Sequence, residues 1–303
     1  MYYLGIDGGG TKTAFVLADE QNNIIAQTIL GPTNPVDVCM QTTLSRLGEG
    51  MDALLEGVPH DTVSVFAGIA GCMSGENRER IQSYLDTLGF ACAACGGDVQ
   101  NVIAAGLGTT DGICTIMGTG SATFLQKDRA LLRFGGYGYL LEEGGSGYAL
   151  GRDAIRAALA SEEAGGEVTL IRNLLLNRIQ KPTVLSALSD FYSGGKSYIA
   201  SFAPLVFEAY EQGDVVAARI LHDNMASVAK EWRKARLALN GDGPVRTVLA
   251  GGLTAQADIL LPMLRSQLDD EAMYDISILT APPVMGALVL AKERYHDQNR
   301  NEK

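Results

Sequence analysis

A glycine-rich turn joins two short apolar runs at the start of this 303-residue chain. Residues 2–6 and 14–18 are apolar, and the residues between them read Asp-Gly-Gly-Gly-Thr-Lys-Thr. This pattern predicts a strand, a tight turn and a second strand. A plain hairpin needs only about two turn residues, so this turn holds more glycine than a hairpin requires. Because glycine lets backbone N–H groups approach phosphate oxygens and threonine adds hydroxyl donors, the turn predicts phosphate binding.

The turn differs from a P-loop. In a P-loop the lysine directly follows the second conserved glycine and a helix comes next. Here Thr11 separates Gly10 from Lys12, and a strand-like run follows. Asp7, at the end of the first predicted strand, is placed to hold a divalent cation through water. We therefore expect a phosphate and metal site of another kind.

The same unit begins again near residue 113. Residues 113–117 are apolar, Gly118, Thr119, Gly120 and Ser121 form a turn, and residues 122–126 are apolar. Alone, the second turn is ordinary, but the pair predicts a duplicated α/β protein that holds a phosphate chain between two lobes. Further elements are expected as strands at 23–29, 62–69, 90–95 and 245–249, helices at 36–56, 76–88, 98–105 and 284–297, a largely helical stretch at 151–240 and a frayed tail at 298–303.

Composition narrows the class of partner. The formal net charge of −11 opposes binding to nucleic acid and to anionic lipid, so neither partner is expected. The five cysteines are odd in number, which favours reduced thiols and a cytoplasmic protein. The first acid, Asp7, comes too early for a signal peptide.

Two local patterns allow more than one interpretation. Cys92 and Cys95 could form a redox pair or half a zinc site, but their alanine neighbours and the lack of a second such pair favour a buried strand without zinc. Asp98 follows Gly96 and Gly97 at a strand-to-helix junction. From the residues alone it is equally a helix N-cap and a candidate general base.

The ordered motifs resemble those of BadF/BadG/BcrA/BcrD-type ATPases and their N-acetylglucosamine kinase-like members. Residues 4–13 resemble the first phosphate motif of that family, residues 116–121 the second, and residues 248–253 the adenosine motif. The resemblance implies a two-lobed actin-like ATPase (ribonuclease H-like) fold with ATP and Mg²⁺ in the cleft. It implies an N-terminal lobe at 1–107, a C-terminal lobe with a helical insert at 108–283, and a helix at 284–303 that returns to the first lobe.

The resemblance also implies roles for particular residues. Asp98 becomes the catalytic base and Asp7 the metal-binding acid. ATP and Mg²⁺ are expected at Asp7, Gly9, Gly10, Thr11, Lys12, Thr13, Gly118, Thr119, Gly120, Gly251, Gly252 and Leu253. The sugar is expected at Asn34, Gly71, Asp98, Ser121, Gly136, Tyr137, Gly138, Glu142, Glu143 and Ser146. Which of Glu142 and Glu143 reads the sugar stays open, since the family pattern Asp-Glu-Gly-Ser is altered here.

The implied activity is ATP-dependent phosphorylation of an amino sugar, N-acetylglucosamine to its 6-phosphate first of all. Glucosamine and N-acetylmuramic acid are alternative substrates. Another alternative is an activator ATPase that couples hydrolysis to a partner enzyme, but the cysteine motifs that bridge its iron–sulfur cluster are missing, so no such cluster is expected. A homodimer is a further expectation from the resemblance.

Overall fold

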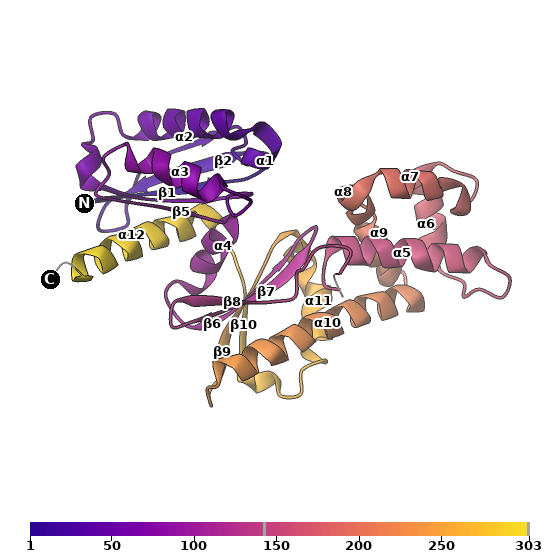
Figure 1. The fold of residues 1–303 in the computed structure, drawn as a ribbon. Coiled ribbons are helices and arrows are strands. Elements are labelled where there is room, and N and C mark those ends of the chain that lie inside the picture. Colours follow the sequence, from indigo (N-terminus) through magenta and orange to yellow (C-terminus); the bar gives the residue numbers. More distant parts are fainter. Residues whose placement is uncertain (142–143, 302–303) are drawn as a thin grey trace. The chain divides into compact units, whose positions relative to one another are not determined.

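The computed structural model describes residues 1–141 and 144–301. They form two compact units, each built on a five-stranded sheet (Figure 1). Unit 1 joins Met1–Thr109 with Leu279–Lys303, and unit 2 is Thr110–Ile278. The α/β class predicted from the sequence is confirmed.

The sheet of unit 1 has the order β3-β2-β1-β4-β5. β1 pairs antiparallel with β2, and β2 with β3, as expected for strands joined by short turns. β1, β4 and β5 are parallel to one another. The strands are β1 (Tyr2–Gly8), β2 (Thr13–Ala18), β3 (Ile24–Leu30), β4 (Val63–Ile69) and β5 (Cys92–Gly96).

Helices cover both faces of this sheet (Figure 1). On one face, leucine and isoleucine side chains of α2 (Met40–Leu54) and α3 (Asn77–Asp86) pack on β1 and β2. On the other, α12 (Pro283–Asn301) packs on β1, β2 and β4 and also contacts α4 (Asp98–Leu107). Two short helices, α1 (Pro35–Val38) and η1 (His60–Thr62), complete the unit.

Unit 2 repeats this topology. Its sheet has the order β10-β9-β6-β7-β8, with β6, β7 and β8 antiparallel and β6, β9 and β10 parallel. The second turn motif found in the sequence thus begins a second copy of the same strand arrangement. The strands are β6 (Gly112–Met117), β7 (Ser121–Lys127), β8 (Ala130–Phe134), β9 (Val245–Ala250) and β10 (Tyr274–Ile278).

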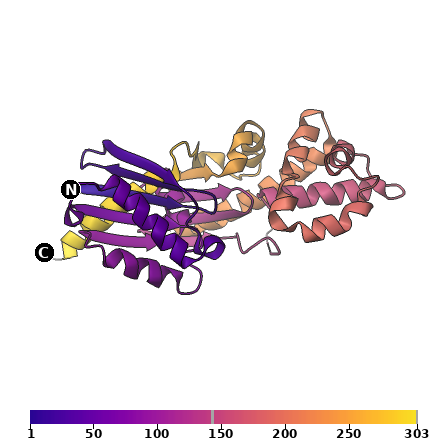
Figure 2. The ribbon, with the colours of Figure 1, turned by 90° about the horizontal axis from the view of Figure 1, so that it is seen from above.

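The helices of unit 2 lie in two groups (Figures 1 and 2). The long helix α10 (Val215–Leu239) and α11 (Ala257–Arg265) pack beside the sheet, and the fully buried Trp232 donates from Nε1 to Thr115 Oγ1 at 2.8 Å. The other helices form a separate bundle that also contacts α10. They are α5 (Gly147–Glu162), α6 (Leu170–Ile179), η2 (Leu185–Ala187), α7 (Leu188–Ser193), α8 (Gly195–Ala200) and α9 (Ala203–Glu211). Two short turns, η3 (Gly252–Gln256) and η4 (Glu271–Met273), flank α11.

Two expectations about elements were wrong, and two strands were not foreseen. The helix predicted at 36–56 is divided, because Cys39 adopts φ 65° and ψ 157°, which ends α1 and starts α2. Strands β8 and β10 were not predicted from the sequence. The tail expected to fray from residue 298 continues α12 to Asn301.

No helix within residues 1–141 and 144–301 combines the length and the apolar character that crossing a membrane requires.

Gly286 sets how closely α12 approaches α4. A Cβ at this position would lie 1.9 Å from the Asn101 carbonyl oxygen and 2.5 Å from the Ala105 nitrogen. Alanine stabilises a helix relative to glycine by about 1 kcal/mol. Overpacking costs about 1–3 kcal/mol, and the cost should dominate here because the neighbouring atoms belong to the backbone of α4, which cannot move aside as a side chain can. We expect Gly286→Ala to lower the free energy of unfolding in urea titration. Gly243→Ala, where the Cβ meets open space, is the control; an unchanged Gly286→Ala variant would contradict the packing argument.

Candidate functional site

In unit 1, the turn between β1 and β2 is closed by a bond from the Gly9 N–H to the Lys12 carbonyl oxygen at 2.9 Å. This closure leaves Gly10, Thr11 and Lys12 exposed at the tip of the turn. A ligand can therefore reach the tip directly, as the phosphate prediction requires. The tip supplies backbone amides, a hydroxyl and an ammonium group, all of which suit phosphate oxygens.

Thr13 behaves differently from the other residues of this turn. Its side chain is fully buried. Its hydroxyl donates to the Gly31 carbonyl oxygen at 2.9 Å and shares a hydrogen bond with Thr33 Oγ1 at 2.9 Å. The Thr33 N–H donates in turn to Gly9 O at 3.2 Å. The Thr13 side chain therefore fastens the loop at 31–34 to the phosphate turn.

That loop brings Asn34 and Gly71 together. Asn34 caps α1 by accepting from the Val36 N–H at 3.1 Å, and its Nδ2 donates to Asp37 at 2.6 Å. Gly71 has φ +72°, and a Cβ there would lie 2.1 Å from Asn34 Oδ1, so only glycine fits beside the amide. Both predicted sugar contacts of unit 1 outside Asp98 thus lie side by side next to the phosphate turn.

Two carboxylates stand at the same edge of this sheet. Asp7 lies near the end of β1 and Asp98 directly after β5, and parallel strands end at one edge. Burial raises the pKa of Asp7, and the neighbouring Asp98 carboxylate raises it further, so the two groups are electrostatically linked. Burial also raises the pKa of Asp98, while the backbone N–H groups at Val99 and Asp98 oppose that shift.

The N-cap of α4 is Gly97, and Asp98 is the first helical residue. The capping alternative for Asp98 therefore does not describe this helix start. Its carboxylate sits in the first turn, where the partial positive charge of the helix N-terminus favours an anion.

Asn101 holds the first of these acids, Asp7, and no pattern in the sequence indicated this role. It is fully buried on α4, and its Nδ2 donates to Asp7 Oδ1 at 2.8 Å. The same nitrogen lies 3.2 Å from the carbonyl oxygens of Ile6 and Gly68. The bond to Asp7 lowers the pKa of that carboxyl and so stabilises its charged form.

These groups fit a divalent cation held through water. Asp7 is a partly buried acid whose pKa is raised further by the Asp98 carboxylate, so a positive charge beside it would be stabilising, and carboxylate oxygens are ligands that Mg²⁺ prefers. Asp7, held by Asn101, is the residue that would face such an ion. Among residues 1–141 and 144–301, no cluster of three or more His, Cys, Asp or Glu side chains is arranged as a direct metal site.

In unit 2, the second turn follows β6. The Gly118 N–H donates to Gly120 O at 2.8 Å, and Thr119 is exposed at the tip. The start of α5 is bonded to this turn, because the Gly147 N–H donates to Gly118 O at 2.8 Å and the Tyr148 N–H to Thr119 O at 3.1 Å.

The predicted adenosine motif lies at the same edge, since β6 and β9 are parallel. Gly251 has φ +98°, and a Cβ there would lie 2.5 Å from Met117 O. The backbone of the motif thus runs directly against the end of β6. Gly252 and Leu253 follow in η3.

The predicted sugar segment continues from β8 to α5. Gly136 has no room for a Cβ, which would lie 2.6 Å from Ser121 O, while Tyr137 and Gly138 are exposed. Ser146 is fully buried, and its Oγ accepts from the Ala149 N–H at 3.0 Å as the N-cap of α5. Glu142 and Glu143 lie outside the described residues. A pocket between this segment and α10 is lined by Ser121, Gly136, Tyr137, Gly144, Ser227 and Glu231.

Cys92 and Cys95 lie on β5, as the sequence predicted. Cys95 is buried in the core, and its thiol donates to the Arg78 carbonyl oxygen at 3.5 Å. Both cysteines are free thiols.

The raised pKa of Asp98 predicts a pH-dependent cost to stability. Its pKa in the folded protein lies above the ordinary 3.8, so its charge opposes folding at neutral pH. That cost shrinks as the pH falls through the raised pKa and is gone at pH values well below 3.8, where the group is protonated in both states. We expect Asp98→Asn to gain stability relative to the wild type at neutral pH, with a gain that shrinks as the pH falls. Urea unfolding at several pH values measures this, and a difference independent of pH would contradict it.

The chain is similar to several known proteins. The sequence pattern of the BadF/BadG/BcrA/BcrD ATPase family matches residues 4–291. An N-acetyl-D-glucosamine kinase of Dictyostelium discoideum is 28% identical over 314 residues, 95% of this chain and 97% of the relative. An N-acetylmuramic acid/N-acetylglucosamine kinase of Clostridium acetobutylicum is 29% identical over 231 residues, 73% of this chain and 75% of the relative.

A solved structure shows the same fold. The crystal structure of a putative N-acetylglucosamine kinase from Chromobacterium violaceum has a TM-score of 0.70 and 23% identity, and the match covers 96% of this chain and 98% of that one. The two-lobed fold predicted from the motifs is therefore confirmed. With the family pattern spanning nearly its whole length, this chain belongs to the BadF/BadG/BcrA/BcrD ATPase family.

Proposed function

We propose that this protein is an ATP-dependent amino-sugar kinase that converts N-acetylglucosamine to its 6-phosphate. The observation that carries the proposal is the edge of the unit 1 sheet, where Asp98 and Asp7 stand beside the phosphate turn and the Asn34 loop. An ATPase that only hydrolyses its nucleotide does not need an acid beside a sugar loop. The two relatives above are both named as kinases of N-acetylglucosamine, which supports that sugar.

The reaction needs a base, bound phosphates and an oriented acceptor. The hydroxyl oxygen of the sugar attacks the γ-phosphorus of ATP while Asp98 accepts the proton of that hydroxyl. ADP leaves with the electrons of the broken P–O bond. A base works best when its pKa is closer to the working pH, so the shift caused by burial favours this role. Asn34 can donate to and accept from sugar hydroxyls.

ATP contacts are proposed in each unit. In unit 1 the exposed tip at Gly10, Thr11 and Lys12 binds phosphate oxygens, and Asp7 holds Mg²⁺ through water. In unit 2 the turn at Gly118 to Gly120 binds phosphates and the Gly251 backbone approaches the adenosine. Bound Mg²⁺ supplies charge neutralisation for the transferred phosphoryl group.

The substrate is tested by measuring ADP release from the purified chain with MgATP and a panel of sugars. We expect N-acetylglucosamine to give the highest kcat/KM, above glucosamine and N-acetylmuramic acid, with glucose as the control that lacks the amino group. Mass spectrometry and NMR of the product should show one phosphate on the 6-hydroxyl. ADP release that is equally fast without sugar would favour a plain ATPase or an activator and would refute the kinase.

The base is tested by Asp98→Asn. Removing a general base costs about 10²–10⁴ in rate, so we expect kcat to fall by at least about a hundredfold. ATP binding, measured by calorimetry, should stay unchanged because the phosphate turns are intact. Asp61→Asn, at an exposed acid on η1 of the same unit, is the matched control. Near wild-type turnover by Asp98→Asn would show that another group accepts the proton.

A further inference from the structure

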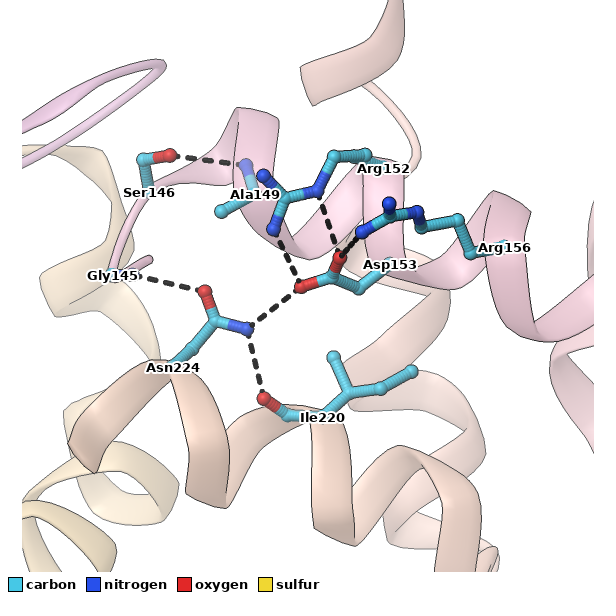
Figure 3. Close-up of polar contacts among 8 residues, drawn as sticks. All are labelled: Gly145, Ser146, Ala149, Arg152, Asp153, Arg156, Ile220 and Asn224. Atoms are coloured by element: carbon cyan, nitrogen blue, oxygen red, sulfur yellow. Dashed lines mark hydrogen bonds and ion pairs between the residues drawn. The ribbon is translucent and has the colours of Figure 1, made fainter. Parts of the chain in front are cut away.

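Asn224, a buried asparagine on α10, holds Gly145 (Figure 3). Gly145 belongs to the segment from Gly136 to Ser146, called here the sugar-reading segment, in which most of the sugar contacts are expected. The side chain of Asn224 is 3% exposed. Its Oδ1 accepts from the Gly145 N–H at 2.9 Å, and its Nδ2 donates to the Ile220 carbonyl oxygen at 2.9 Å and to Asp153 Oδ2 at 3.3 Å. One amide thus joins the segment, its own helix and α5.

The segment runs so close to α10 that only glycine fits. A Cβ at Gly145, which has φ +76°, would lie 2.4 Å from Val228 Cγ2. A Cβ at Gly144 would lie 2.8 Å from Ser227 Oγ. The backbone therefore rests directly on the face of α10 that carries Asn224. Because the Gly145 N–H is buried there, it needs an acceptor, and Asn224 Oδ1 supplies it.

Asp153 fixes which way the Asn224 amide points. Its carboxylate is held by Arg152, with Nε 2.8 Å from Oδ1 and a second bond of 3.1 Å to Oδ2, and Arg156 lies 3.8 Å from Oδ1 (Figure 3). A carboxylate only accepts hydrogen bonds, so the NH₂ group of Asn224 must face it. The carbonyl oxygen of the amide is then left for Gly145.

Beyond Gly145 the chain enters α5 at once, capped by Ser146. The segment is consequently fixed at Gly145 by Asn224 and at Ser146 by the helix start. Glu142 and Glu143, two of the predicted sugar contacts, lie outside the described residues. Gly144, next to the anchors, lines a pocket together with Ser121, Gly136 and Tyr137, which are also predicted sugar contacts.

We propose that Asn224 is a positioning residue that sets the sugar-reading segment for catalysis, acting through its bond to Gly145. This rests on the proposed function, since the segment matters to the reaction only if the substrate is a sugar. Asn224 does not touch the substrate itself. Its loss should weaken sugar binding and leave nucleotide binding, because the phosphate turn of unit 2 has its own bonds to Gly147 and Tyr148.

The test is Asn224→Ala in the full chain, with KM for N-acetylglucosamine, KM for ATP and kcat measured separately. Loss of one buried hydrogen bond predicts a rise in the sugar KM of about tenfold. The KM for ATP should change by less than about twofold, well below the effect of one lost bond. Asn173→Ala, at an exposed asparagine on α6, is the matched control and should change neither. A folded Asn224→Ala enzyme with an unchanged sugar KM, or with equal rises in both KM values, would overturn the proposal.

Amide hydrogen exchange on the wild-type protein gives a second measurement that does not depend on whether the variant folds. The Gly145 amide should exchange slowly, and N-acetylglucosamine should slow it further while ADP alone does not. Exchange at the rate of an unprotected amide would overturn the proposal. If the wild-type enzyme phosphorylates no amino sugar, the proposed function fails instead, and protection of Gly145 without sugar still reports whether the anchor exists.

Discussion

In each unit, the parallel pairing of the central strand, β1 or β6, with the strands beside it is the constraint on which the candidate site residues of that unit depend. In unit 1, β1, β4 and β5 run the same way, so the chain leaves all three at one edge of the sheet. Asp7, Gly71 and Asp98 are far apart in sequence but come from those three strand ends. In unit 2 the same pairing of β6 with β9 brings Gly118 and Gly251 to one edge. The chemistry can be divided among short loops because the sheets fix where the loops begin.

This arrangement buries two carboxylates of like charge, which costs free energy of folding. Asp7 and Asp98 are both partly removed from water, which raises the pKa of each, and the Asp98 carboxylate raises the pKa of Asp7 further. Asn101 offsets part of that cost at Asp7, and the helix N-terminus offsets part at Asp98. The Nδ2 of Asn101 has two hydrogens and three acceptors within reach. The Oδ1 of Asn101 has no hydrogen-bond partner among the described residues. A buried position on α4 is thus occupied by a polar side chain that holds Asp7 rather than by an apolar one.

Sequence reasoning succeeded for the strands and turns that form short, continuous motifs. Both phosphate turns and the strands beside them are local, and glycine with threonine between apolar runs is a pattern that few other structures need. It failed where the pattern is weak: β8 is largely exposed and β10 alternates exposed with half-buried residues, so neither has a continuous apolar run. The break at Cys39 was missed because a cysteine at positive φ has no sequence signature. Asn101 and Asn224 were missed because their partners are 94 and 79 residues away, and each lies in an otherwise regular helix.

Some residues of the segments predicted to bind ligands have side chains that hold the protein's own loops in place. Thr13 and Ser146 both belong to segments predicted to bind ligands, yet both are fully buried with their hydroxyls engaged within the protein. Thr13 fastens the sugar loop to the phosphate turn, and Ser146 starts the helix whose first amide groups bond to the second phosphate turn. A motif therefore records the residues needed to shape a loop as well as those that meet the substrate. Exposure at the tip, as at Thr11 and Thr119, is the physical property that distinguishes a hydroxyl free to meet phosphate from one that holds the turn in place.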